Sequence, residues 1–405
     1  MAGIKEIILS HSEEIKDEVI KLRRHFHRYP ELSYSETITS SFICKWLGNN
    51  GIGFISGIAG TGIIATIKGL SGDGKVIGLR AEMDALPINE KNQCEYKSTI
   101  PGIMHACGHD GHMAMLMGAA LILNKLKSHF GGTVLLIFQP GEEKSPGGAK
   151  LMIESGAFNS IKPDIFIAQH HLPELETGKV GYKSGRYMAS CDEIYITVTG
   201  RGGHAALPGL TTDQVYIASK LVVKLKETMA QQVTVNQIPT VLGIGRIIGE
   251  GATNIIPEKV EIAGTFRTFD EKWRSEGLAL VRSVAEEVAS ETGVNIDVRI
   301  AEGYPVLCND VKLTEMAMIY SEELLGKDKI ETFDVRMSSD DFSFYNALAP
   351  SLYYRVGIKE KNTPMRKLHT PDFDLDEAGL KTGVANLSWL VYRFLTDSVG
   401  FSRRK

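Results

Sequence analysis

Residues 105–112 read His-Ala-Cys-Gly-His-Asp-Gly-His and so place three histidines, a cysteine and a carboxylate within eight positions. Imidazole and thiolate groups are the ligands that borderline-soft divalent metal ions prefer. Gly108 and Gly111 allow the backbone to fold tightly around an ion. A polar loop with scattered histidines is the alternative, but it does not explain so many metal-binding groups in one short segment. The segment therefore predicts one part of a metal site.

Glu142 and Glu143 are adjacent carboxylates that come shortly after an apolar run. Like charges in a low-dielectric cleft repel each other, so such a pair is costly unless it serves a function. Because successive side chains diverge, one carboxylate could bind a metal ion while the other acts as a base. A solvated loop tip with Lys144 as counter-ion is the alternative, and the nearby histidine cluster makes it less favoured.

Three isolated histidines are weaker candidates. His170 follows a predicted strand, His369 lies in a Leu-His-Thr-Pro segment, and His204 lies in a glycine-flanked loop. Each of them alone is more typical of a structural or surface histidine than of a ligand. Spacing by itself therefore leaves these three positions open.

The elements that must position these residues alternate between short apolar runs and helical patterns. Runs typical of buried strands cover residues 62–68, 75–80, 133–138 and 164–168. Runs without polar alternation indicate strands buried on both faces of a largely parallel sheet. Polar clusters at 82–84, 141–143 and 169–171 are expected to follow these strands, at the sheet edge where ligands gather. We expect a mixed, mostly parallel α/β sheet with flanking helices, the plan of a phosphorylase/hydrolase-like catalytic domain.

The pattern changes near residue 183 and changes back near residue 304. The intervening segment has the order βαββαβ, which is typical of a ferredoxin-like α+β sandwich. A chain of 405 residues is long for one hydrophobic core. We therefore expect a discontinuous catalytic domain over residues 1–183 and 304–405 and an inserted satellite domain over residues 184–303.

Composition excludes several classes of partner. A net charge of −4 offers no general attraction to nucleic acid or to an anionic membrane. Five scattered cysteines do not form a disulfide framework and suit a reducing compartment. The charged N-terminal segment indicates one amphipathic helix over about residues 4–25, with no signal-peptide core and no membrane span. The expectation is a cytoplasmic protein.

Eight motifs, read together, resemble a known family of enzymes. They are LRAEMDALP (79–87), MHACGHDGH (104–112), FQPGEE (138–143), GGHAALP (202–208), TNIIPE (253–258), GTFRTF (264–269), SSDDFSFY (338–345) and LHTPDFDLDE (368–377). In family order, and over nearly the whole chain, they look like the amidohydrolase branch of the co-catalytic metallopeptidases. That branch includes hippurate hydrolases, N-acyl-amino-acid deacylases (aminoacylases) and plant indole-acetyl-amino-acid hydrolases.

The resemblance implies a centre with two divalent metal ions, bound by Cys107, His109, Glu143, His170 and His369. It implies that Glu142 is the general base and that His204 stabilises the tetrahedral intermediate, often across a dimer interface. The softness of a thiolate ligand favours zinc, manganese or nickel over magnesium or calcium.

The resemblance also implies residues that hold the substrate. Asn254 matches the residue that binds the substrate carboxylate, and Arg267 is a weaker candidate for the same role. Asp84 matches an aspartate that, in sister branches, orients a preceding metal-binding histidine, which Glu82 replaces here. Gly209 stands where the family pattern has a histidine, and this departure concerns a substrate contact rather than the metal centre.

The leading hypothesis is hydrolysis of the amide bond of a small N-acyl-L-amino acid, such as an N-acetyl or N-benzoyl substrate, by a homodimer or higher homo-oligomer formed through the satellite domain. A dipeptidase or carboxypeptidase of the same family is the nearer alternative, and a non-catalytic metal-binding homologue is the more distant one. Cys107 could instead be a covalent nucleophile paired with His109 or His105. Such an enzyme would need neither a Glu-Glu pair nor further histidines at strand ends.

Overall fold

The computed structural model describes residues 3–397, and the chain divides into two compact units. The first unit comprises Met1–Gly185, Cys308–Asp334 and Asp341–Lys405, and the second comprises Arg186–Leu307 and Val335–Asp340. The segment 335–340, which the sequence-based division assigned to the catalytic domain, thus falls in the second unit. The extreme ends of the predicted catalytic domain, residues 1–2 and 398–405, lie outside the described residues.

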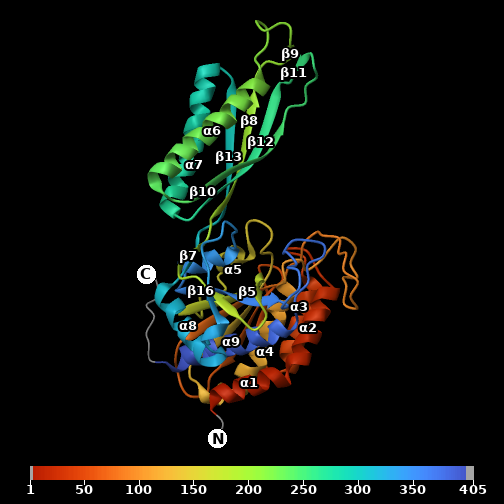
Figure 1. Ribbon diagram of the computed structural model, residues 1–405, viewed down its shortest axis with the longest axis vertical. Helices are drawn as coiled ribbons and strands as arrows, with labels where there is room; N and C mark the ends of the chain where they lie inside the picture. The colour runs from red at the N-terminus through yellow and green to blue at the C-terminus, as the bar shows by residue number, and fades with distance from the viewer. Residues whose placement is uncertain (1–2, 398–405) are drawn as a thin grey trace. The chain divides into compact units, whose positions relative to one another are not determined.

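The first unit is built on an eight-stranded sheet in the order β1-β2-β4-β3-β5-β16-β6-β15, of which Figure 1 labels β5 and β16. Its strands are β1 (Gly53–Ile58), β2 (Gly62–Lys68), β3 (Val76–Glu82), β4 (Thr133–Gln139), β5 (Ile165–Glu176), β6 (Val180–Tyr182), β15 (Ile330–Thr332) and β16 (Ser351–Lys359). The neighbours β4-β3-β5-β16 are all parallel, and so are β6 and β15. The other three pairings are antiparallel. The predicted mixed, mostly parallel α/β sheet is confirmed.

Helices flank this sheet. They are α1 (Ile4–Glu14), α2 (Lys16–Arg28), α3 (Thr37–Asn49), α4 (His109–Lys125), α5 (Gly148–Glu154), α8 (Val311–Leu325) and α9 (Ala378–Thr396), with short 3-10 turns η1 (Lys127–His129), η2 (Lys327–Lys329) and η3 (Asp341–Ala347). A Cβ on Gly118 of α4 would come within 2.8 Å of both Val19 on α2 and Val384 on α9. The glycine therefore allows three helices to pack closely.

Two sequence-based expectations about these elements are wrong. The single helix expected over residues 4–25 is two helices, because the backbone at Ile15 leaves helical geometry, with φ −96° and ψ 2°. The polar clusters at 82–84 and 169–171 do not simply follow their strands, since Glu82 is the last residue of β3 and His170 lies inside β5. Strand β5 continues because His170 pairs with Arg355 of β16. The length of an apolar run underestimates the length of a strand when the strand also contains buried polar side chains that have partners.

The second unit has a four-stranded antiparallel sheet in the order β10-β12-β8-β13. Along the chain its main elements are β8 (Cys191–Thr199), α6 (Gln214–Asn236), β10 (Thr240–Ile248), β12 (Lys259–Thr268), α7 (Glu271–Thr292) and β13 (Asn295–Tyr304). Alternate residues of β8, Ile194, Ile196 and Val198, are buried in one core with side chains of α6 and α7. This is the βαββαβ order of a ferredoxin-like sandwich.

Short strands complete the list: β7 (Gly185–Met188), β9 (Gly203–His204), β11 (Ile255–Ile256) and β14 (Leu307–Asn309). Side chains cap the two long helices of the second unit, where Asp213 accepts from the backbone N–H of Tyr216 and Asp270 accepts from that of Trp273. Within residues 3–397, no helix is long and apolar enough to cross a bilayer.

Candidate metal centre

Cys107 and His109 lie at the start of α4, separated by a glycine in a left-handed conformation. Gly108 has φ +89°, which an L side chain rarely adopts, and a Cβ there would come within 2.7 Å of the His171 ring. Cys107 Sγ lies 3.5 Å from His170 Nε2, so the turn brings α4 and β5 together. The three donor atoms of Cys107, His109 and His170 lie within 4.8 Å of one another.

The ring of His109 is oriented by Asp84. His109 Nδ1 lies 2.8 Å from the backbone oxygen of Asp84 and 3.3 Å from its Oδ1, so this nitrogen is the donor. His109 Nε2 is then left with a lone pair, and it is buried without a hydrogen-bond partner among the described residues. Asp84 Oδ2 also accepts from the backbone N–H of Glu143 at 2.9 Å. One buried carboxylate therefore places both His109 and the Glu-Glu segment.

His170 is held in a similar way. Its Nδ1 donates to the backbone oxygen of His171 at 2.7 Å, which leaves Nε2 facing Cys107. Burial, together with the positive charge of Arg355, holds the pKa of His170 well below its ordinary value. The imidazole is therefore neutral, as a metal ligand must be.

A second group of donors joins Cys107 to Glu143 and His369. Their donor atoms also lie within 4.8 Å of one another. His369 Nε2 lies 3.1 Å from Glu143 Oε1, yet that oxygen makes no hydrogen bond to any described residue. His369 has φ +60°, and its backbone N–H donates to the oxygen of Ala106 at 2.8 Å. The loop thus holds His369 beside Cys107 through a backbone contact.

Glu142 lies beside both groups. It is 7% exposed, and its carboxylate belongs to a third cluster of ligand atoms with His109 and Glu143. A thiolate, imidazoles, carboxylates and buried polar atoms that lack partners form a donor set that fits two divalent ions of borderline softness. Cys107 is common to the first two groups, so it is the donor placed to touch both positions.

Glu82 and His112 also lie close to His109, but their ligand atoms are already engaged. Glu82 is paired with Arg80 through one oxygen, and its other oxygen accepts from His112 Nδ1 at 2.8 Å. His112 Nε2 accepts from the backbone N–H of His171 at 3.0 Å. Sister branches of the family have a metal-binding histidine at the position of Glu82. In this chain Glu82 is instead part of a buried ion pair next to His109.

The charges around the site favour a cation. Burial raises the pKa of the Cys107 thiol well above its ordinary value, and the Glu143 and Glu142 carboxylates raise it further. Burial alone would lower the pKa of His109, but Glu82 and Asp84 raise it to about 10. The negative charges around the two donors contribute to both shifts. A divalent ion reverses them, because it stabilises the thiolate and displaces the imidazole proton.

The remaining predicted residues lie in the second unit. His204 is exposed on β9, opposite Ile255 of β11, and the Ala205 N–H donates to the backbone oxygen of Asn254 at 2.9 Å. His204 and Asn254 are thus neighbours on two exposed segments that pair through β9 and β11. Arg267 lies on β12, where its guanidinium donates to the Met337 backbone oxygen at 2.9 Å. Gly209, where a histidine was expected, lies in open space.

Sequence reasoning missed residues that support the site. Arg23 lies in the charged N-terminal segment that was predicted to be an amphipathic helix, yet it is completely buried and ion-paired with Asp110, next to His109. His171 packs on Gly108 and Gly111, where a Cβ would come within 2.7 and 2.2 Å of its ring. No spacing pattern marks Arg23. The two glycines were a signal, but of close packing by a side chain as much as of a tight turn.

Comparisons with known proteins agree with this geometry. Residues 78–393 match peptidase family M20/M25/M40. The N-acetyl-L-cysteine deacetylase of Bacillus subtilis is 36% identical over 380 residues, which is 93% of this chain and 87% of that protein. Thermostable carboxypeptidase 1 of Saccharolobus solfataricus is 35% identical over 385 residues, 94% of this chain and 96% of that protein.

One solved structure is a dinuclear metal-binding peptidase of the M20 family from Bacillus subtilis. It superposes with a TM-score of 0.80 at 30% identity and covers 95% of this chain and 99% of that chain. The chain belongs to peptidase family M20/M25/M40 and is a metal-dependent amidohydrolase of that family. The family resemblance inferred from the motifs is confirmed.

Proposed function

We propose that the protein hydrolyses the amide bond of N-acyl-L-amino acids with two divalent metal ions held by Cys107, His109, Glu143, His170 and His369. The observation that carries this proposal is the convergence of these five donors, contributed by separate segments, on one place next to Glu142. The similarity to a protein named for deacetylation of N-acetyl-L-cysteine supports the choice of substrate class.

In this reaction Glu142 would transfer protons and Asp84 would orient a metal ligand. Glu142 accepts the proton of the attacking water and passes it to the leaving amine, ordinary acid–base catalysis worth about 10²–10⁴-fold. When bound, the two ions lower the pKa of water and polarise the substrate carbonyl. Asp84 keeps His109 in the tautomer that presents Nε2, through contacts of 2.8 and 3.3 Å.

The second unit would supply groups that act on the rest of the substrate. We assign to His204 the stabilisation of the developing oxyanion, and to Asn254 and Arg267 the binding of the substrate carboxylate. His204 is exposed, and its Nδ1 accepts from the backbone N–H of Ala206 at 3.1 Å. Its Nε2 is therefore the nitrogen that can donate to an oxyanion.

We propose a homodimer formed through the second unit and a cytoplasmic location. Strands β10 and β13 are the edges of the four-stranded sheet, and an unpaired edge is a common route to association. All five cysteines are free, which suits a reducing compartment.

A carboxypeptidase or dipeptidase is the second candidate, and the similarity to a protein named as a carboxypeptidase favours it. Both reactions hydrolyse an amide beside a free carboxylate, so they need the same centre. They differ only in whether an acyl group or a further amino-acid residue occupies the other side of the bond.

A substrate panel tests these assignments. Apo-protein would be reloaded with zinc, manganese or nickel and incubated with N-acetyl and N-benzoyl amino acids, dipeptides and blocked peptides, with chromatographic detection of the released amino acid. The proposal expects release from the N-acyl amino acids at the highest kcat/KM. A preference for peptides would favour the second candidate, and no turnover with any metal would contradict both.

A further inference from the structure

Arg23 of α2 is a completely buried guanidinium with a carboxylate on each of its three nitrogens. Nε donates to Asp110 Oδ2 at 2.8 Å, Nη2 to Asp374 Oδ1 at 2.8 Å, and Nη1 to Glu377 Oε1 at 3.3 Å. Its side chain is 0% exposed. Burying a charge costs desolvation free energy. A buried guanidinium with this many directed hydrogen bonds therefore suggests that its geometry serves a purpose.

The carboxylates that Arg23 joins belong to the two segments that contribute different metal donors. Asp110 follows His109 in the first turn of α4, and Asp374 belongs to the loop that continues from His369. His109 is in the group with Cys107 and His170, whereas His369 is in the group with Cys107 and Glu143. Through the side chains of Asp110 and Asp374, Arg23 therefore links the segment that carries His109 to the loop that carries His369.

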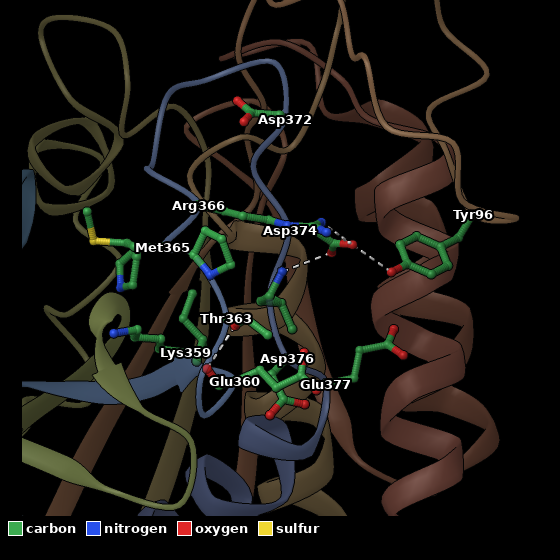
Figure 2. Close-up of a pocket in the computed structure, with 14 residues that line it drawn as sticks. Tyr96, Lys359, Glu360, Thr363, Met365, Arg366, Asp372, Asp374, Asp376 and Glu377 are labelled. Carbon is green, nitrogen blue, oxygen red and sulfur yellow. Dashed lines mark hydrogen bonds and ion pairs between the residues drawn. The ribbon is translucent and has the colours of Figure 1, made fainter.

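Asp374, on the loop that carries His369, also contacts residues other than Arg23 (Figure 2). Asp374 points toward Tyr96, whose hydroxyl donates to Asp374 Oδ2 at 2.8 Å, and toward Arg366, which lies 3.3 Å from the same oxygen. The other oxygen, Oδ1, accepts from Arg23. On the helix side, His27 Nδ1 lies 2.7 Å from Asp110 Oδ2, so the atom that accepts from Arg23 is held from a second direction.

We propose that Arg23 is a positioning residue that fixes the distance between the two metal positions by holding His109 and His369 in register. Only a planar, three-armed donor satisfies carboxylates in three directions, and the point charge of lysine does not. This inference rests on the proposed two-metal function. His369 is half exposed and lies on a loop, so the position that depends on it is the one that loses affinity when the link is cut.

The test is the binding of zinc to apo-protein, measured by calorimetry and by competition with a chromophoric chelator, for wild type and Arg23→Lys. The wild type is expected to bind two ions. In Arg23→Lys, the second ion is expected to bind about 10–100-fold more weakly, the usual cost of losing a partner that orients a ligand. The first ion should keep its affinity within a few-fold.

Arg24→Met is the matched control. Arg24 is the next residue on α2, pairs with Glu377 and lies over the same Tyr96 ring, 4.8 Å from its centroid against 4.7 Å for Arg23. It is 42% exposed, and within residues 3–397 it forms an ion pair with Glu377 alone. Both zinc affinities should remain unchanged in this variant.

Asp374→Asn provides a second variant if Arg23→Lys fails to fold. It cuts the same link from the loop side and should also weaken only the second ion. Equal loss of both ions, or unchanged binding in folded Arg23→Lys or Asp374→Asn protein, would overturn the positioning role. A wild type that binds fewer than two ions would instead contradict the proposed function, so the two failures are distinguishable.

Discussion

The residues that support the metal centre in the first unit and the candidate substrate residues of the second unit differ in burial. In the first unit, Arg23, Arg80, Glu82 and His112 are all at most 2% exposed, and each makes hydrogen bonds to other buried side chains. In the second unit, His204 and Asn254 are exposed on two turns joined by the two residue pairs of β9 and β11, and these turns together form the exposed turn of that unit.

This difference indicates how each unit contributes to function. A buried network whose hydrogen bonds are satisfied is rigid. Such a network can hold metal ligands at fixed positions before the substrate binds. An exposed turn with few backbone bonds orders its side chains weakly. Changes in the first unit should therefore affect metal binding or chemistry, whereas changes in the exposed turn should affect turnover and leave metal content intact.

The largest effect is expected at the base. Glu142→Gln keeps the size of the side chain and removes the proton acceptor, so kcat should fall by about 10²–10⁴-fold. Zinc content, measured by atomic emission, should stay at the wild-type level because Glu142 is assigned no ligand role. A variant with full rate would show that another group accepts the proton.

The comparison predicts a smaller loss at the exposed turn. His204→Ala should lower kcat by about 10²–10³-fold, the usual cost of one oxyanion donor. KM and both zinc affinities should change little. Loss of a bound ion in this variant would mean that the exposed turn belongs to the metal centre, and the contrast between the units would fail.

A third prediction concerns the core of the second unit. Leu221 on α6 is 0% exposed, and Leu221→Ala should lower the free energy of unfolding of that unit by about 2–5 kcal/mol. Because the first unit has its own core, zinc stoichiometry at 25 °C should be unchanged while the melting transition shifts downward. A simultaneous loss of zinc would show that the two cores are coupled.

The smallest effect is a pH dependence of stability in the first unit. Burial raises the pKa of Asp374, but the charge of Arg23 and the hydrogen bonds from Tyr96, the Leu375 backbone N–H and Arg23 together hold it below the ordinary value of 3.8. A carboxyl with a depressed pKa stabilises the folded state above pH 3.8, and this contribution is lost as the pH falls through its folded-state pKa.

Asp374→Asn should therefore be less stable than wild type by about 1–3 kcal/mol at pH 7. The difference should shrink as the pH drops below about 4. Urea unfolding at several pH values measures it. A difference that does not depend on pH would mean that Asp374 acts through packing and not through charge.

Motifs and apolar runs predicted much of the first unit. The bounds of β2, Gly62–Lys68, agree with the sequence pattern because the strand is a mostly apolar run between glycine-rich turns. The pattern failed at β5, where buried histidines continue the strand, and at Ile15, where a charged segment that looks like one helix is two. At β5 the pairing with β16 outweighs the local pattern.

The amino-acid sequence by itself determined the chemistry available to this protein: a thiolate, imidazoles and paired carboxylates in motifs that identify the family. Only the tertiary structure decided that Nε2 of His109 and of His170 faces the site, that Glu82 and His112 bond each other, and that Arg23 lies inside the protein. These outcomes depend on partners far apart in the chain, such as Arg23 and Asp374, and local sequence patterns carry no information about distant hydrogen bonds.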